Sequence, residues 1–204
     1  MLGIADYPAF VGAVILFLAI PGPGNLALLT ATGMAGVRGG LMSCLGIIAG
    51  DQVLMWAAVA GLSAVLMASP AWFGAVQWMG AIYLGYLGIK MVLAKPGDAP
   101  LLDMSSGRFF RQSLWITLFN PKAIVFYMAF FPLFVDPQQP PTWATFGLMA
   151  VTIAALTFLY SLILTVLASR LRRRMSQHPW IGPLLQKVAG TLLVAFGLRL
   201  VFQK

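Results

Sequence analysis

Six long apolar stretches dominate this chain of 204 residues and leave it few ways to fold. They cover residues Ala9–Ala31, Leu41–Leu66, Ala71–Leu93, Leu114–Val135, Trp143–Leu167 and Ile181–Phe202. A helix needs about 20 predominantly apolar residues to cross the hydrocarbon core of a bilayer, and each stretch reaches that length. We therefore predict an all-α membrane protein with six transmembrane helices.

The composition excludes a soluble domain. Hydrophobic residues make up 60% of the chain and charged residues only 9%, and the mean hydropathy is +0.90. A soluble domain carries about 25% charged residues, so this chain could not cover itself with a hydrated surface. The net charge of +8 does not indicate nucleic-acid binding, because the basic residues lie in short connections and not on an amphipathic face. The expected surroundings are a lipid bilayer, with no nucleic acid.

Redox and metal chemistry find no support in the sequence. Cys44 is the only cysteine and His178 the only histidine, so neither an internal disulfide nor a histidine metal site can form. A membrane enzyme or thiol-based electron carrier would need paired cysteines, clustered histidines or several carboxylates. We expect no cofactor, no metal and no enzymatic activity.

Two sharp interruptions stand inside the apolar stretches. The first stretch contains Pro21-Gly22-Pro23-Gly24-Asn25 and the fourth contains Asn120-Pro121-Lys122. Such breaks free backbone groups that hydrocarbon cannot satisfy, so they persist only where protein buries them or where they line a cavity. Breaks at matching places in two halves of a chain are typical of a transporter's binding site.

The positions of Lys and Arg predict the orientation in the membrane. The connections after the first, third and fifth stretches are basic, with Arg38, Lys90, Lys95, Arg108, Arg111, Arg170, Arg172, Arg173 and Arg174. The N-terminus and the connections Ala68–Pro70 and Phe134–Thr142 contain no Lys or Arg. The positive-inside rule then places the basic connections in the cytoplasm and both termini in the periplasm.

Three crossings per half give the two halves opposite orientations, because an odd number of crossings reverses the direction of entry. We predict a single transmembrane domain, residues 1–204, built as a 3+3 inverted repeat with broken first and fourth helices. The repeats would be residues 1–96 and 108–204. The segment Leu93–Gly107, rich in Pro, Gly, Asp and Ser, would join them.

The residues at the breaks predict two new helix starts near the middle of the membrane. Asn is a favoured N-cap and Pro a favoured first helical residue, so Asn120-Pro121 indicates the start of a half-helix, and Gly24-Asn25 after Pro21 and Pro23 indicates another. Two helix N-termini offer unpaired N–H groups and positive dipole ends to an anion such as a carboxylate. The alternative is a pair of structural kinks. We expect substrate contact at Pro21, Gly22, Pro23, Gly24, Asn25, Asn120, Pro121 and Lys122.

Two charged residues lie at comparable depth. Asp51 is well inside the second stretch, beside Gln52, where insertion of a charged side chain costs about 2.5 to 3.5 kcal/mol, so we predict a function for it, namely proton coupling. Lys122 could pair with Asp51 or with a substrate carboxylate, or its long stem could reach an interface. Gln77 in the third stretch is a further candidate for substrate binding, and Tyr83 and Tyr86 could line the site or belong to an interfacial aromatic belt.

Small and hydroxyl residues recur at helical spacing. Gly46-x-x-x-Gly50 and Ala81-x-x-x-Gly85 permit close helix approach, more often inside one chain than between copies, so a homo-oligomer stays open. Thr157, Ser161 and Thr165 share one face of the fifth stretch and could line a polar pathway. Hydroxyls that bond back to their own helix explain the same spacing.

Taken in order, the motifs resemble the lysine-exporter (LysE/RhtB) family of bacterial amino-acid exporters. They are Pro21-Gly22-Pro23-Gly24-Asn25, the glycine-rich run from Gly33 to Gly50, the segment Gly80–Gly88, Asn120-Pro121-Lys122-Ala123, and Phe130–Pro137. The similarity runs effectively from end to end. It implies a multi-pass protein of the bacterial inner membrane that exports amino acids or close derivatives, energised by the proton gradient.

The acidic residues favour a neutral substrate. An exporter of basic amino acids would be expected to carry more intramembrane acid than Asp51 alone, so the sequence favours a neutral, branched or homoserine-like compound. Proton antiport through Asp51 is the predicted mechanism. A passive channel or a solute exchanger of the same fold is the alternative. The channel differs from the antiporter in needing no titratable group.

Overall fold

The computed structural model of the chain describes residues 4–62, 78, 82, 85–86, 88–93, 104–105, 107–136, 141–175, 184, 187–188, 190–192, 194–195 and 198. Nearly all of the described residues are helical. Ile4 and Val135 form an isolated antiparallel β-bridge. The all-helical character predicted from the sequence is therefore confirmed for the described part of the chain.

Helix α1, Tyr7–Ala19, is the first half of a broken element. The Asp6 carboxylate caps it by accepting a hydrogen bond from the backbone N–H of Ala9 at 2.9 Å, and Pro8 occupies its first turn. It ends because Pro21 forces Ile20 out of the helical region, to φ −65° and ψ 119°. The chain then restarts as α2 at Pro23.

Helix α2, Pro23–Ala57, is two helices joined by a tight turn. Ala35 and Gly36 leave helical geometry there, and Gly36 has φ 62°, which glycine adopts without strain. The turn folds the chain back closely enough that a side chain at Gly39 would collide with the Ala31 carbonyl. The run Pro23–Gly61 is long and apolar enough to cross a membrane, but this turn divides it into parts of the first two predicted spans.

The fourth apolar stretch is also broken. Helix α5, Phe109–Leu118, ends before Asn120, and helix α6, Pro121–Val125, begins directly after it. The chain continues as a π-helical turn η2, Phe126–Phe130, and a 3₁₀ turn η3, Phe131–Phe134. A second π-helical turn, η1, covers Ala58–Leu62 after α2. The predicted break at Asn120-Pro121 is confirmed.

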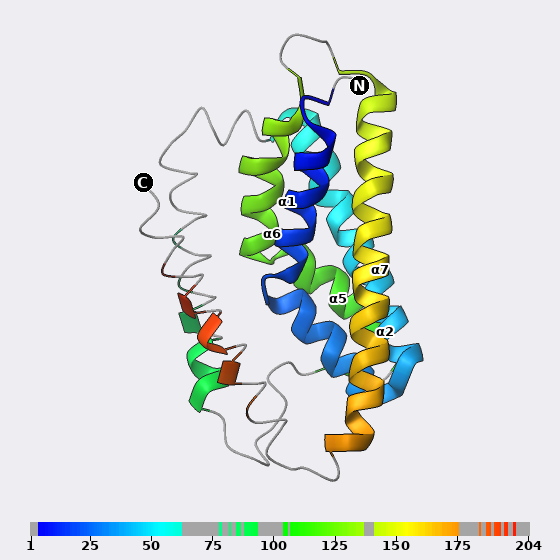
Figure 1. The fold of residues 1–204 in the computed structure, drawn as a ribbon, viewed down its shortest axis with the longest axis vertical. Coiled ribbons are helices and arrows are strands. Elements are labelled where there is room, and N and C mark those ends of the chain that lie inside the picture. The colour runs from blue at the N-terminus through cyan, green and yellow to red at the C-terminus, as the bar shows by residue number, and fades with distance from the viewer. Residues whose placement is uncertain are drawn as a thin grey trace.

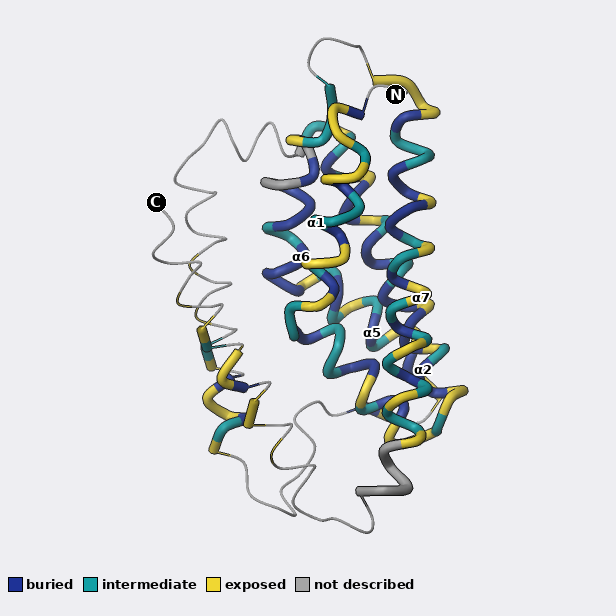
Figure 2. The backbone as a smooth tube through the Cα atoms, in the orientation of Figure 1, coloured by how far each residue is buried: buried dark blue, intermediate teal, exposed yellow. Residues whose placement is uncertain are grey.

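Helix α7, Trp143–Met175, is the longest uninterrupted element and packs along α2, which also packs against α5 (Figure 1). Its segment Trp143–Arg170 is long and apolar enough to span a bilayer. Exposed positions gather on its outer side, while buried ones face the bundle (Figure 2). The main core joins α1, α2, η2, η3 and α7 through side chains such as Phe10, Met55, Tyr127, Phe131 and Met149.

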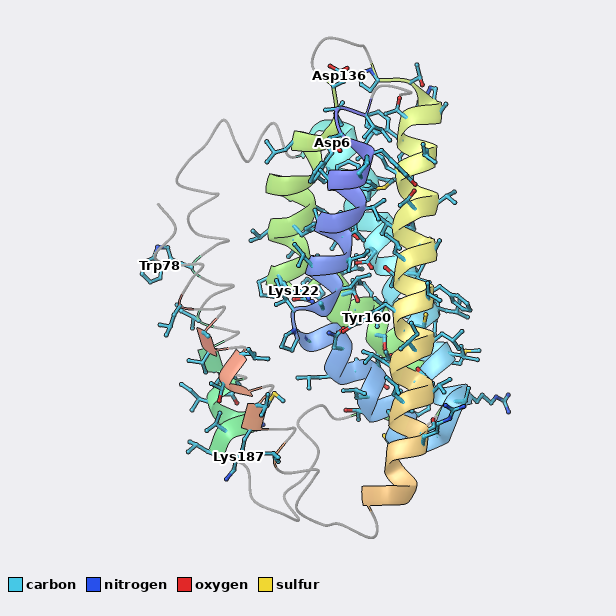
Figure 3. All side chains as sticks on the ribbon, viewed as in Figure 1. Asp6, Trp78, Lys122, Asp136, Tyr160 and Lys187 are labelled. Carbon is cyan, nitrogen blue, oxygen red and sulfur yellow. The ribbon has the colours of Figure 1, made fainter. Side chains whose placement is uncertain are left out.

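One end of the bundle is closed by contacts between distant segments. The N–H of Ala5 donates to the carbonyl of Phe134 at 3.0 Å, next to the Ile4–Val135 bridge. Asp6 and Asp136 mark this end in Figure 3. The turn that carries Arg38 and the Arg170 end of α7 lie at the opposite end (Figure 1). Arg38 and Arg170 therefore lie at the end of the bundle opposite Asp6 and Asp136, and the orientation in the membrane stays a prediction.

The third and sixth predicted spans fall mostly outside the described residues. The residues that are described within them are helical, and the backbones of Gly88 and Gly190 approach so closely that a side chain on either would meet the other's carbonyl oxygen, at 2.6 and 2.7 Å. Most of the predicted linker Leu93–Gly107 also lies outside the described part. Among the described residues two helical segments, Pro23–Gly61 and Trp143–Arg170, are long and apolar enough to cross a membrane, and the 3+3 arrangement stays a prediction.

Candidate functional site

The two helix breaks meet halfway along the bundle, although they are almost a hundred residues apart in the sequence. A Cβ placed on Gly22 in the first break would lie 3.4 Å from the Cδ and Nζ atoms of Lys122 in the second. Lys122 is labelled at this level in Figure 3, and Tyr160 of α7 lies at a similar height. The ring of Phe17 from α1 stacks on Phe126 of η2 with centroids 4.2 Å apart, which joins the two breaks on their apolar side.

Lys122 binds the carboxyl end of α1. Its ammonium donates to the carbonyl oxygens of Phe17 at 2.7 Å and Ile20 at 2.6 Å, and lies 4.4 Å from the centroid of the Phe17 ring. The last carbonyls of a helix lack intrahelical donors and carry the negative end of its dipole, so a cation is favoured there. The side chain is only 6% exposed. Lys122 therefore faces the break and does not extend to an interface.

Asn25 has a different position from the predicted one. The N-cap of α2 is Gly22, with extended backbone and no side-chain cap, and Pro23 is the first helical residue. Asn25 lies inside the first turn, where its amide Nδ2 donates to the carbonyls of Leu18 at 3.1 Å and Ile20 at 3.5 Å and to the Tyr160 hydroxyl at 3.4 Å. A new helix does start within the predicted motif, but the prediction that Gly24-Asn25 forms its start is wrong: Gly22 is the N-cap, and the Asn25 amide is free to bond to α1.

The second break matches the prediction. Asn120 is the N-cap of α6, with its Oδ1 accepting from the backbone N–H of Lys122 at 3.1 Å, and Pro121 is the first helical residue. The preceding helix closes with backbone bonds of its own, from Phe119 N–H to the Trp115 carbonyl and from Asn120 N–H to the Thr117 carbonyl, both at 3.0 Å. Asn120, Pro121 and Lys122 are all buried.

Asp51 lies in α2 close to these breaks and is 2% exposed. The Tyr127 hydroxyl of η2 hydrogen-bonds to its carboxyl group, and Thr157 of α7 faces the same group. The carboxyl oxygen Oδ2 has no hydrogen-bond partner. Lys122 interacts with Asp51 electrostatically, but no ion pair joins them in the described structure, because the ammonium is bound to the α1 carbonyls.

Other predicted residues fall into three groups. Gln77 and Tyr83 lie outside the described residues. Tyr86 is 60% exposed, which fits a membrane-facing position better than a site lining. Gln52 donates to the Ala150 carbonyl at 3.1 Å and so ties α2 to α7.

Sequence reasoning missed Phe17, Tyr127 and Tyr160. Phe17 and Tyr127 are embedded in apolar aromatic runs, so composition alone does not distinguish them. Tyr160 directly precedes Ser161, one of the hydroxyl residues Thr157, Ser161 and Thr165 of α7, and this neighbourhood was the available signal in the sequence.

The arrangement can hold both charges of a zwitterion. The backbone N–H of Leu26 donates to the Gly22 carbonyl at 3.1 Å, so Gly24 and Asn25 lie in the first turn of α2. The N–H groups of a first helical turn have no partner within the helix and can bind an anion. The carboxyl of Asp51 offers an acceptor to a cation. Among the described residues no group of three or more His, Cys, Asp or Glu side chains could hold a metal ion.

Comparisons with known proteins agree with this description. The family model of the LysE type translocator matches residues 15–204. Leucine efflux proteins of Salmonella choleraesuis strain SC-B67 and Salmonella typhi are 31% identical over 202 residues, covering 97% of this chain and 95% of theirs. The leucine efflux protein of Klebsiella pneumoniae is 31% identical over 203 residues, with the same coverage.

No solved structure matches the chain. The family match, which covers both helix breaks, confirms the resemblance drawn from the motifs. The chain therefore belongs to the LysE type translocator family and is a membrane transporter, not an enzyme.

Proposed function

We propose that this transporter exports a neutral, leucine-like amino acid from the cytoplasm across the bacterial inner membrane and couples export to proton entry through Asp51. The observation that carries the proposal is the match to leucine efflux proteins over 97% of the chain. Asp51 supplies the coupling group, since it is an acid buried beside those breaks.

The charges around the site favour a neutral amino acid over a basic one. The other acids of the chain are Asp6, Asp98, Asp103 and Asp136, all outside the predicted spans, so Asp51 is the only intramembrane carboxyl group. The Lys122 ammonium already occupies the α1 carbonyls. A substrate with a second positive charge would meet one carboxylate and one ammonium, whereas a zwitterion needs one partner for each of its charges.

The proposed binding mode uses the helix ends. The substrate carboxylate binds at the start of α2, in the segment Pro21 to Asn25, where Gly24 and Asn25 carry backbone N–H groups in the first turn, and near Asn120, Pro121 and Lys122. The substrate ammonium binds Asp51, and the apolar side chain lies against aromatic rings such as Phe17 and Phe126. Gln77, outside the described residues, stays a candidate contact.

Asp51 exchanges a proton for the substrate as access alternates. A bound ammonium stabilises the carboxylate, and when the substrate leaves on the outer side a proton replaces it as the neutralising partner. On the inner side the next substrate displaces that proton, which enters the cytoplasm. Each cycle moves one amino acid outward and one proton inward, and every charge buried in the site has a partner throughout.

Asp51→Asn tests the coupling, because asparagine retains the shape of the side chain but cannot titrate. Purified variant in proteoliposomes should still exchange labelled leucine for unlabelled leucine, yet should fail to concentrate it when a pH gradient is imposed. Asp6→Asn is the matched control, since asparagine caps a helix as well as aspartate and this acid lies at the bundle end. Equal pH-driven accumulation by Asp51→Asn and wild type would remove Asp51 from the mechanism and favour a passive channel or a solute exchanger.

The proposed topology is six spans in a 3+3 inverted repeat with both termini in the periplasm. Cysteine introduced at Gln138 should react with a membrane-impermeant thiol reagent added to intact cells, in a background carrying Cys44→Ser. Cysteine at Gln177, next to the arginine-rich end of α7, should react only after the cells are opened. Labelling of intact cells at Gln177 alone would reverse the orientation.

A further inference from the structure

A seam of buried polar atoms runs along the interface between α2 and α7. Five buried side-chain oxygens of the described structure have no hydrogen-bond partner: Asp51 Oδ2 of α2, Thr117 Oγ1 of α5, and Thr157 Oγ1, Thr165 Oγ1 and Ser169 Oγ of α7. Three of them belong to one face of α7, at positions separated by multiples of four. Ser161 belongs to the same face and is 2% exposed.

Contacts across the interface place these groups in order. Asp51 of α2 faces Thr157 of α7. One turn further along α7, the Ser161 hydroxyl shares a hydrogen bond with the Cys44 thiol. Two turns further, Thr165 faces Gly40. A Cβ on Gly40 would lie 2.6 Å from Thr165 Oγ1, so only glycine lets α2 approach this hydroxyl of α7 so closely. The seam therefore leads from the buried carboxyl group towards the turn that carries Arg38.

The hydroxyls of Thr157 and Thr165 differ from those of Thr32 and Thr152. Thr32 donates to the Leu28 carbonyl at 2.7 Å, and Thr152, also on α7, donates to the Leu148 carbonyl at 2.8 Å and lies 2.9 Å from the Tyr7 hydroxyl. Thr157 and Thr165 are 1% and 0% exposed and make no such bond. Leaving a buried hydroxyl unpaired costs about 1 to 3 kcal/mol, so a row of them is retained only if water pairs with it or a function requires it.

We propose that this seam is a hydrated proton route between Asp51 and the cytoplasmic end of the bundle. Water molecules bind the hydroxyls of Thr157, Ser161, Thr165 and Ser169, and the proton that leaves the Asp51 carboxyl group passes to the first of them. Asp51 is left as a carboxylate, and one proton is released at the end of the route near Arg38. From Thr157 to Ser169 the route spans about 18 Å at 1.5 Å per helical residue.

The route rests on the proposed proton antiport and adds a path for the proton that is separate from the path of the amino acid. The titratable groups that surround Asp51 are Tyr127 of η2, Lys122 of α6 and Cys44 of α2 itself. Lys122 is held by α1 carbonyls and Tyr127 by the carboxyl group. The seam is the polar exit that does not pass through the two breaks.

Thr165→Val tests the route, because valine has the shape of threonine without the hydroxyl. In proteoliposomes with a pH-sensitive dye inside, leucine-driven proton flux should fall severalfold, while exchange of labelled for unlabelled leucine should keep its wild-type rate. Thr165→Ser, which restores a hydroxyl, should recover the proton flux. Thr152→Val is the matched control on the same helix, since its hydroxyl is already paired outside the seam.

The outcomes separate the two proposals. Absence of leucine-driven proton flux in the wild-type protein would contradict the antiport itself. Normal flux in the wild type and an equal flux in Thr165→Val would overturn the seam alone. Thermal unfolding in detergent confirms that the variant is folded, which is expected because valine removes an unpaired buried hydroxyl.

Radiolytic labelling provides a second measurement that does not depend on transport. Hydroxyl radicals generated by X-rays modify buried sulfur atoms that lie beside bound water. Each sulfur is compared with its own labelling in the unfolded protein, because a thiol reacts with hydroxyl radicals faster than a thioether. On that scale Cys44 in the seam should be labelled well above Met55 and Met149 of the apolar core, although all three are essentially inaccessible from the surface. Labelling of Cys44 as weak as that of the two methionines would mean a dry seam and would overturn the proposal.

Discussion

The two helix breaks look alike in the sequence but are stabilised in opposite ways. At the second break one side chain acts locally: Asn120 caps the helix that follows it, and the helix before it closes with its own backbone. At the first break no side chain caps α2, and the carbonyls of α1 are satisfied by Asn25 and by Lys122 from the other break. The second break is self-contained, whereas the first depends on its partner.

This difference has a consequence for transport. A break whose helix end is bound by a residue of the other break cannot move independently of it, so α1 and α6 are expected to move together. No side chain caps the start of α2, so its backbone N–H groups can bind a ligand. At the start of α6 the N–H of Lys122 already donates to the Asn120 side chain. We therefore expect the substrate carboxylate to bind mainly at the first break.

The largest effect is expected from Lys122→Met, which retains the apolar stem and removes the ammonium. The Phe17 carbonyl loses its donor and the Ile20 carbonyl keeps only the longer bond from Asn25. Each buried carbonyl left unpaired costs about 1 to 3 kcal/mol, so thermal stability in detergent and amino-acid export should both fall strongly. Lys90→Met, at an exposed lysine, is the control. If Lys122→Met unfolds at the wild-type temperature, the first break does not depend on the second.

Asn120→Ala should have an intermediate effect, confined to the second break. Loss of the N-cap costs about 0.5 to 2 kcal/mol of local stability. Export should decline before the amount of protein in the membrane does, and Asn120→Ser should restore both because serine also caps. Export by Asn120→Ala at the wild-type rate would show that the cap is a kink device with no part in transport.

Asn25 variants should change stability the least. They distinguish two roles of the Asn25 side chain, as the N-cap of α2 or as a hydrogen-bond donor to the carbonyls of α1. Asn25→Ala loses a neutral hydrogen bond of 3.1 Å, worth about 0.5 to 1.5 kcal/mol. Asn25→Asp should be worse than Asn25→Ala, because a carboxylate would face the carbonyls of Leu18 and Ile20. An N-cap would show the reverse order, since aspartate caps as well as asparagine. Unfolding temperatures of the two variants decide between these roles.

The sequence was informative wherever a local rule was sufficient. Apolar stretches of spanning length predicted the helices, and Asn followed by Pro predicted the start of α6, because capping depends only on neighbouring residues. Gly46 and Gly50 also behave as predicted, since they let α2 approach Phe110, Leu114 and Thr117 of α5 within the chain. The same local rule failed at Asn25, where Gly22 had already taken the capping position.

By itself, then, the sequence determined that the chain is helical, belongs in a membrane, is interrupted at two matching places and carries one acid among its spans. Only the tertiary structure decided what those groups touch: Lys122 on the end of α1, Tyr127 on Asp51, and Ser161 on Cys44. The physical reason is that helix formation and membrane insertion depend on residues a few positions apart. The partner of a buried charge or hydroxyl depends on which helix packs beside it, and no local pattern encodes that.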